Sequence, residues 1–266
     1  MLGVGALIDS MRTLRRHGYS FWRAEQAKAR SGDPLPVSLR AGPTLFVRPG
    51  NSDIEVVRQV FIERQYDVWV EAMKSRIQRA CEAILAEGAV PVIVDAGANI
   101  GASALWFSEL YPAARVVAIE PDPGNAAMLR RNVAGRDAVT VVEAALGGEP
   151  GRVSLLPSDE AWSVRTERSD HGCPVVTVAE AVAKVPGGRP FIVKLDIEGF
   201  EHDVFAGNVD WLDEAFVVFV EPHDWMLPGT GTSRAFQREF GRRDFEMLLL
   251  YDQICYIRQD GSRAAS

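Results

Sequence analysis

The stretch PVIVDAGANIG, residues 91–101, decides the fold of this 266-residue chain. Its first half is a short apolar run rich in β-branched residues, which is typical of a buried strand. Its second half is a loop with two glycines four positions apart, and a helical pattern follows over 102–110. Glycine lets the backbone turn sharply between the two elements. The stretch therefore predicts a strand–loop–helix unit of a parallel α/β sheet.

The same alternation of short apolar runs and helical stretches continues along the chain. We expect further strands at residues 115–120, 139–143, 191–196 and 215–221, and an extra strand at 152–156. We expect helices at 124–133, 177–185 and 233–241, and a hairpin at 245–251 and 254–258. Repeated strand–helix units produce a mostly parallel sheet with helices on both faces. The closing hairpin makes the final strand antiparallel.

Residues 1–88 lack the regular alternation of short apolar runs and helical stretches. They are predicted to form an N-terminal extension, followed by a domain at 89–266. An amphipathic helix at 2–8 is expected to dock on the body, and a turn cluster at 31–36 precedes an extended run at 45–48. Ser52 or Asp53 is expected to cap the helix that follows. A longer helix is expected from Tyr66 to Ala86. It should stop at Gly88, because glycine is common just after the last residue of a helix.

Composition excludes several classes of protein. Hydrophobic residues make up 47% of the chain and charged residues 24%, which is ordinary for a globular protein. The net charge of −7 and a pI near 5.2 argue against nucleic acid as a partner, since its phosphates need a basic face. The apolar runs are far shorter than the roughly 18 residues of a membrane span, and no export signal is visible, so we expect a soluble cytoplasmic protein. Cys81, Cys173 and Cys255 are too far apart for a zinc or disulfide pattern.

Acidic and small residues end the first three strands of the parallel sheet, where ligands bind. Asp95 begins the glycine loop, whose spacing differs from the G-x-G-x-x-G of dinucleotide-binding proteins. Glu120 ends the second strand, where an acid can accept both hydroxyls of a ribose. Glu143 and Ala144 end the third, where small residues leave room for a flat base. Together these residues predict a nucleoside-type ligand.

The fourth and fifth strands end in groups that can accept a proton. The run KLDIEGFE, residues 194–201, places Asp196, Glu198 and Glu201 beside a lysine, although Glu201 also fits a simple helix start. The run EPH places Glu221 and His223 at the same edge of the sheet. Histidine can take a proton near neutral pH. We therefore expect the reaction centre at this edge.

Three of these motifs together resemble the FkbM family of S-adenosylmethionine-dependent methyltransferases: DAGANIG at 95–101, EP at 120–121 and KLDIEGFE at 194–201. The segments VRPGNSDI at 47–54 and RQY at 64–66 also look like the segment that precedes the core in that family. The K-x-D-I-E-G-x-E run is the most specific part of the resemblance. In all, the similarity extends from about residue 45 to residue 258.

The resemblance implies a Rossmann-like class I methyltransferase fold with a seven-stranded sheet, an EC 2.1.1 activity, and residues 1–88 capping a bound S-adenosylmethionine. Its methionine end would be held by Asp95, Gly97, Asn99 and Gly101. The ribose would be held by Glu120, with Asp122 and Asn125 nearby. The adenine would lie beside Glu143 and Ala144. Three further residues would close over the cofactor: Asp53, Tyr66 and Ser163.

We expect methyl transfer to a hydroxyl group of a small molecule, sugar or natural product. In-line placement of the acceptor against the methyl carbon can contribute roughly 7–11 kcal/mol to lowering such a barrier. Asp196 would orient the methyl group or the acceptor, His223 or Glu198 would take the proton, and Glu221 would fix the imidazole tautomer.

Three alternatives stay open. Asp196, Glu198, Glu201, Glu221 and His223 could together hold Mg²⁺, but clustered acids near a helix start are usually not metal sites, so no metal is expected. The chain could also be a cofactor-binding module without catalysis. A nicotinamide-dependent oxidoreductase is the third alternative, against which the loop spacing argues. Whether the chain forms a homo-oligomer also stays open.

Overall fold

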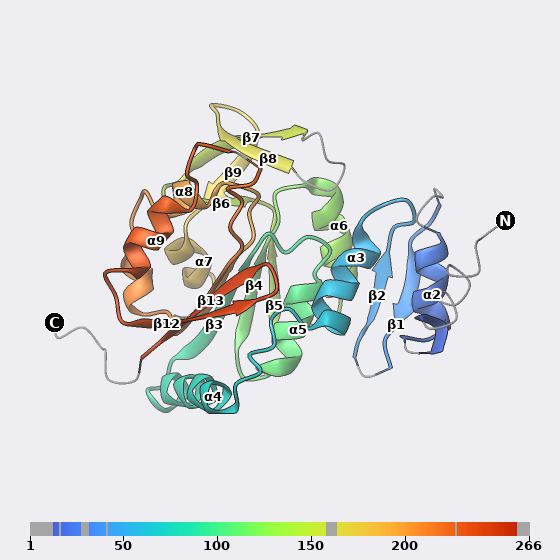
Figure 1. Cartoon of the computed structure of the whole chain (residues 1–266), viewed down its shortest axis with the longest axis horizontal. Coiled ribbons are helices and arrows are strands. Elements are labelled where there is room, and N and C mark those ends of the chain that lie inside the picture. Colours follow the sequence, from blue (N-terminus) through green and yellow to red (C-terminus); the bar gives the residue numbers. More distant parts are fainter. Residues whose placement is uncertain are drawn as a thin grey trace.

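A seven-stranded sheet forms the centre of the computed structural model, which describes residues 13–15, 17–27, 32–40, 42–157, 164–226 and 228–259 (Figure 1). In order across the sheet, the strands are β12 (Phe245–Leu250), β13 (Gln253–Arg258), β11 (Val217–Val220), β10 (Gly188–Leu195), β3 (Val90–Ala96), β4 (Arg115–Ile119) and β5 (Val139–Val142). The strands from β11 to β5 pair in parallel, and β13 is antiparallel to both of its neighbours. The predicted class I methyltransferase-like fold is thereby confirmed, including its antiparallel closing strand.

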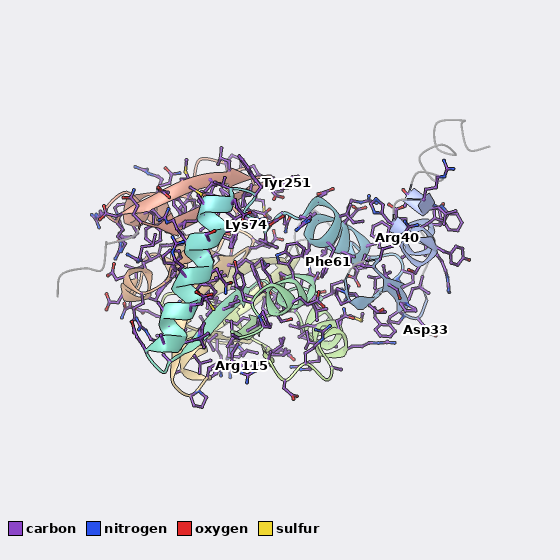
Figure 2. All side chains as sticks on the ribbon, turned by 90° about the horizontal axis from the view of Figure 1, so that it is seen from below. Asp33, Arg40, Phe61, Lys74, Arg115 and Tyr251 are labelled. Atoms are coloured by element: carbon purple, nitrogen blue, oxygen red, sulfur yellow. The ribbon has the colours of Figure 1, made fainter. Side chains whose placement is uncertain are left out.

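Side chains of the central strands alternate between two apolar layers, as the pleat of a strand requires. In β3, Val92 and Val94 pack in one layer, and Ile93 packs in the other. The layer of Val92 also contains α7 (Val178–Ala183), α8 (Glu201–Val204) and α9 (Arg234–Phe240). The layer of Ile93 contains α4 (Glu71–Ala86), α5 (Ala102–Leu110) and α6 (Pro123–Asn132), and Figure 2 shows α4, which carries Lys74, lying across this face. Because helices cover both faces, the strands read as continuous apolar runs.

A second, four-stranded sheet was only partly predicted. It consists of β6 (Ala145–Leu146), β9 (Cys173–Val176), β7 (Gly151–Pro157) and β8 (Val164–Arg168), whereas the sequence predicted one strand at 152–156. The sequence of β8 is VRTER, whose polar residues become a strand by pairing with β7. Arg168 fixes this sheet to α8, because its Nε lies 2.8 Å from Oδ2 of Asp203 and its Nη2 lies 2.5 Å from Oδ1.

The N-terminal part contains α2 (Tyr19–Gln26), the hairpin of β1 (Leu35–Ser38) and β2 (Thr44–Val47), α3 (Asp53–Val57), and η1 (Arg58–Glu63), which is π-helical. The helix predicted to start at Tyr66 is too long, since α4 begins only at Glu71. The backbone of Arg64, with φ of 60°, ends η1, and the buried Tyr66 and Val68 follow in an irregular stretch. The burial of these two side chains in the core thus outweighs the preference of this stretch for a helix.

Two statements about the N-terminal part stay predictions. The helix expected at residues 2–8 lies outside the described residues. Gly88 lies in the turn between α4 and β3, and the division into domains there is untested. Across the described ranges, we find no helix with the length and apolar character needed to cross a bilayer.

Arg48 joins the N-terminal part to the sheet domain. Its Nε and Nη2 donate to the two oxygens of Asp53 at 2.9 and 2.7 Å, and its backbone N–H donates to Oδ2 at 2.7 Å. Nη2 also donates to Oδ1 of Asn125, in the first turn of α6, at 2.6 Å. Neither Ser52 nor Asp53 caps α3 with its side chain, contrary to expectation, since the Asp53 carboxylate binds Arg48 instead.

Alanine at Gly97 is expected to destabilise the fold more than alanine at Gly88. Both glycines have left-handed backbones, with φ of 73° and 78°, so each substitution costs about 1–2 kcal/mol in backbone strain. A Cβ at Gly97 would also lie 1.7 Å from the backbone oxygen of Asp196, whereas nothing lies within 4 Å of one at Gly88. In urea titrations, the free energy of unfolding should fall by at least about 2 kcal/mol more for G97A than for G88A. Equal losses would contradict this close approach.

Removing the Arg48 side chain should cost far more stability than removing an exposed arginine. Asp53 is 0% exposed, so R48A leaves a buried carboxylate without its cationic partner, at about 3–5 kcal/mol. Arg136 and Glu109 form a pair whose side chains are 42% and 38% exposed, and R136A should therefore cost less than about 1 kcal/mol. Chemical denaturation of both variants measures the difference. A similar loss for the two would show that the Arg48 pair is not a structural joint.

Candidate functional site

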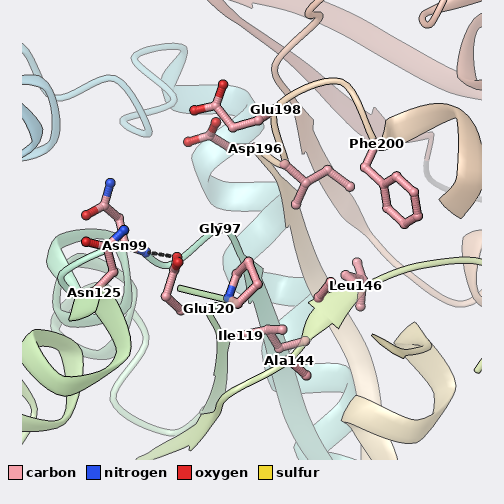
Figure 3. A pocket seen from close by; sticks show the side chains of 13 residues that line it. Gly97, Asn99, Ile119, Glu120, Asn125, Ala144, Leu146, Asp196, Glu198 and Phe200 are labelled. Carbon is pink, nitrogen blue, oxygen red and sulfur yellow. Dashed lines mark hydrogen bonds between the residues drawn. The ribbon is translucent and has the colours of Figure 1, made fainter. Parts of the chain in front are cut away.

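Two adjoining cavities open at the carboxyl ends of the parallel strands, where sheets of this kind bind ligands. The Glu120 cavity lies between the ends of β3 and β4 and the β6 segment (Figure 3). The Lys194 cavity lies between the sheet and the α3–η1 segment. Both are lined by Gly97, Asn99, Asp196 and Glu198. Ligands in the two cavities would therefore meet at this shared wall.

Glu120 is a buried carboxylate, 5% exposed, whose oxygens are each held by one backbone N–H. The N–H of Asn99 donates to Oε2 at 2.8 Å, as Figure 3 shows, and the N–H of Asp122 donates to Oε1 at 2.9 Å. A carboxylate oxygen has two acceptor positions, so neither backbone N–H uses up the oxygen that it binds. Burial raises the pKa of Glu120 to about 7, although the two N–H donors and a hydrogen bond from the side chain of Asn125 oppose the shift.

An apolar wall stands beside this carboxylate. Ile119, Ala144, Leu146 and Phe200 line the Glu120 cavity, and the first three come from the ends of β4 and β5 and from β6. Ala144 thus lines the same cavity as Glu120, and its contact with an adenine stays a prediction. Glu143 is not a lining residue, because its Oε2 forms a surface ion pair with Arg130 at 2.8 Å. The wall is suited to a flat, apolar ring.

The glycine loop between β3 and α5 is predicted to contact the cofactor. Only some of its residues line the two cavities. Gly97 and Asn99, with φ of 73° and 48°, line both cavities. Gly101 precedes α5 and packs against α6, where a Cβ would lie 2.6 Å from Leu129. Asp95 lies beneath the loop and lines neither cavity, and its Oδ2 accepts a hydrogen bond from Oγ of Ser103 at 2.7 Å.

Of the residues expected near the ribose or over the cofactor, only some line a cavity. Tyr66 lines the Lys194 cavity and Asn125 lines the Glu120 cavity. Asp122 caps α6, since its Oδ1 accepts the N–H of Asn125 at 2.8 Å. Asp53 lines neither cavity because its carboxylate is bound within the N-terminal segment. Ser163 lies outside the described residues.

Lys194 is a buried cation beneath the shared wall. Its Nζ donates to the backbone oxygen of Gly97 at 2.7 Å and lies 3.3 Å from Oδ1 of Asp95 and Oδ2 of Asp196. Burial lowers the pKa of Lys194, but Tyr66 and these two carboxylates raise it well above its ordinary value. The lysine is therefore charged at neutral pH and holds the ends of β3 and β10 together.

His223 is 2% exposed and faces four carboxylates. Its Nδ1 donates to Oε1 of Glu201 at 2.7 Å, and its Nε2 lies 3.9, 3.8 and 3.6 Å from oxygens of Asp196, Glu198 and Glu221. Burial lowers the pKa of His223, but the hydrogen bond to Glu201 and the surrounding negative charges raise it to about 10. While no other cation neutralises these carboxylates, the imidazole carries both protons at neutral pH and cannot accept another. Glu201, instead of the expected Glu221, holds its Nδ1.

Glu198 is the carboxylate of this cluster that is most available to a ligand. It lines both cavities, and its buried Oε2 has no hydrogen-bond partner among the described residues. Burial and the charge of Asp196 raise the pKa of Glu198 to about 7. Burial also raises the pKa of Glu221, whose Oε2 accepts a hydrogen bond from Nε2 of Gln253 at 2.6 Å. Glu198 thus has the freer oxygen and the pKa nearer neutrality.

The sequence did not predict the roles of Arg48 and Gln253, and it left the role of Glu201 open. Arg48 belongs to the quoted VRPGNSDI segment, but its contact with Asn125 depends on the folded chain. Gln253 lies at the start of β13 and reaches Glu221 only because β11 and β13 are neighbours. Glu201 had a signal, since it ends the KLDIEGFE run, but a helix-start acid was an equally good interpretation.

The chain is similar in sequence to known methyltransferases. Residues 95–243 match the family model of the methyltransferase FkbM domain. The 2-O-methyltransferase NoeI of Sinorhizobium fredii is 28% identical over 52% of this chain and 65% of that protein. The hexuronic acid methyltransferase AglP of Haloferax volcanii is 31% identical over 52% of this chain and 58% of that protein. Among solved structures, cofactor-bound Rv0187 from MTB superposes with a TM-score of 0.41 at 14% identity, over 95% of this chain and 97% of that chain.

The alignments cover less than two thirds of the length of either curated relative. The family model, in contrast, matches more than half of this chain and extends from the end of β3 to the segment after α9. It includes Glu120, Lys194 and His223. The chain therefore belongs to the methyltransferase FkbM domain family.

Proposed function

We propose that this chain is an S-adenosylmethionine-dependent methyltransferase that acts on a hydroxyl group of a sugar or a similar small molecule. The observation that carries the proposal is Glu120, a buried carboxylate that two backbone N–H groups orient in the cavity wall, at the end of the second strand of the FkbM domain. The names of the two relatives, a 2-O-methyltransferase and a hexuronic acid methyltransferase, support a sugar acceptor.

The residues of the Glu120 cavity fit the adenosine half of this cofactor. The two carboxylate oxygens of Glu120 match the two hydroxyls of a ribose. Ala144 and Leu146 offer an apolar wall for adenine. The loop of Gly97 and Asn99 leads from this cavity to the Lys194 cavity, which has room for the methionine half. When bound, S-adenosylmethionine supplies an electrophilic methyl group on a sulfonium.

The Lys194 cavity fits a hydroxylated acceptor. Ser52, Glu55, Gln59 and Gln65 contribute polar side chains from the N-terminal part, opposite Asp196 and Glu198 of the sheet. Such a lining can accept and donate hydrogen bonds to several hydroxyls. Glu198, on the wall shared with the Glu120 cavity, takes the proton of the reacting hydroxyl, and Asp196 orients the acceptor. Loss of that proton makes the oxygen a better nucleophile.

Calorimetric titration with S-adenosylhomocysteine, with NAD as the comparison ligand, tests the proposed cofactor. We expect saturable one-to-one binding of S-adenosylhomocysteine and no binding of NAD, because the glycine loop lacks the dinucleotide spacing. Binding of NAD alone would overturn the proposal in favour of an oxidoreductase. Binding of S-adenosylhomocysteine without methyl transfer to any hydroxylated acceptor would favour a cofactor-binding module.

The affinity for S-adenosylhomocysteine should fall as the pH is lowered through 7. Glu120 has a raised pKa of about 7, and a protonated carboxyl loses an acceptor position for the ribose hydroxyls. Because binding favours the charged form, each pH unit below 7 should weaken binding by up to about tenfold. The E120Q variant should bind weakly at pH 8 and lose this dependence. The exposed Glu109 provides the control E109Q, and an unchanged pH profile in E120Q would contradict the assignment.

The E198Q variant should lower kcat by about 100-fold or more while the Kd for S-adenosylhomocysteine changes little. Glutamine keeps the size of the side chain but cannot accept the proton, a role that contributes about 10²–10⁴-fold. Steady-state kinetics and calorimetry on the same preparation separate the two effects. E214Q, a change at an exposed ion pair with Arg189, is the matched control. A kcat within about threefold of wild type would assign proton transfer to another group.

A further inference from the structure

We propose that Asp196, Glu221 and His223 form a binding site for one divalent cation of the Mg²⁺ or Mn²⁺ type, at the wall of the Lys194 cavity. The sequence led to the expectation of no metal, because acids near a helix start are common. The folded chain adds what the sequence lacked, which is the approach of one ligand atom from each residue to within 4.8 Å of the other two. The site itself does not depend on the proposed methyl transfer.

The spacing of the three ligand atoms suits a small cation. Nε2 of His223 lies 3.9 Å from Oδ1 of Asp196 and 3.6 Å from Oε1 of Glu221, and the ligand atoms of the three residues all lie within 4.8 Å of one another. These separations are too long for hydrogen bonds. Two ligands about 2.1 Å from Mg²⁺ lie about 3.0 Å apart at a right angle and about 4.2 Å apart on opposite sides. The two separations from Nε2 of His223 fall within this range, so these atoms are spaced for a shared cation instead of binding one another.

In each of the three side chains, the nitrogen or oxygen atom that is not a proposed ligand contacts a different buried residue. Glu201 accepts from Nδ1 of His223 at 2.7 Å, Lys194 lies 3.3 Å from Oδ2 of Asp196, and Gln253 donates to Oε2 of Glu221 at 2.6 Å. These partners leave Nε2, Oδ1 and Oε1 as the inward atoms. Groups that orient metal ligands in this way, above all a carboxylate on the second nitrogen of a histidine, are typical of metal sites.

The excess of carboxylates around Lys194 and His223 also favours a bound cation. Asp95, Asp196, Glu198, Glu201 and Glu221 contribute carboxylates around Lys194 and His223. Two further oxygens here, Oε2 of Glu198 and Oε2 of Glu201, are buried and have no hydrogen-bond partner among the described residues. Buried negative charge without partners is unfavourable. A divalent ion would neutralise part of this negative charge.

The ligand set selects the class of ion. Two carboxylates, one imidazole and no thiolate fit Mg²⁺ or Mn²⁺, which keep water molecules in their remaining positions. Those open positions face the cavity that Asp196 and Glu221 line. If the proposed function holds, neighbouring hydroxyls of the acceptor would replace these waters, so that the cation would position the reacting oxygen beside Glu198.

Mn²⁺ binding to the chelator-treated full chain, measured from the electron paramagnetic resonance signal of free Mn²⁺, tests the site. We expect saturation at one equivalent per chain, with competition by Mg²⁺. E221Q and H223Q should each weaken Mn²⁺ binding by at least about tenfold, and Q253A should weaken it because Glu221 loses its outer partner. Asp252 neighbours the cluster but is not one of its ligands, so D252N is the control and should bind like wild type.

Titration of the same preparations with S-adenosylhomocysteine separates this inference from the proposed function. His223 lines neither the Glu120 cavity nor the Lys194 cavity, so a folded H223Q variant should still bind S-adenosylhomocysteine. No saturable Mn²⁺ binding by wild type would overturn the metal site, whatever the nucleoside does. Unchanged Mn²⁺ binding in both E221Q and H223Q would overturn the assigned ligands. An equal loss in D252N would show a general attraction of cations to acidic residues, and binding of Zn²⁺ without Mn²⁺ would overturn the class of ion.

Discussion

The buried ammonium group of Lys194 is the interaction on which the rest of the site depends. A charge in an apolar interior is costly unless it is paired and hydrogen-bonded. Its partners are the backbone oxygen of Gly97, which follows β3, and the carboxylates of Asp95 and Asp196, which belong to β3 and follow β10. One cation therefore holds two loops in contact, so close that Gly97 has no room for a Cβ against Asp196. The wall that both cavities share is the result.

The two sides of this wall have opposite chemistry. On the side of β4, one buried carboxylate, Glu120, stands beside apolar side chains such as Ala144 and Leu146. On the side of β10 and β11, carboxylates surround His223, and polar side chains of the α3–η1 segment face them. The first side suits recognition of a nucleoside, and the second suits proton transfer or a cation. A parallel sheet brings these functions together because its strands all end at one edge.

The strand ends could be predicted because apolar runs and glycine loops are local signals. Glu120, Ala144 and Asp196 accordingly follow strand ends, as the sequence predicts, and all three line the Glu120 cavity. Side-chain partners could not be predicted, because they come from distant parts of the chain. Asp53 has the position of a helix cap in the sequence, yet it is bound by Arg48. The strand pairing of β8 and the irregular stretch before α4 likewise depend on tertiary contacts that override local preference.

The division of the site into a nucleoside side and a reaction side is the central claim, and a crystal structure of the chain with S-adenosylhomocysteine tests it most directly. We predict the ribose hydroxyls on the two oxygens of Glu120, the adenine against Ala144 and Leu146, and the sulfur atom at the wall between Asp196 and Glu198. A nucleoside bound between the α3–η1 segment and Tyr66, with Glu120 left without a ligand, would contradict the account.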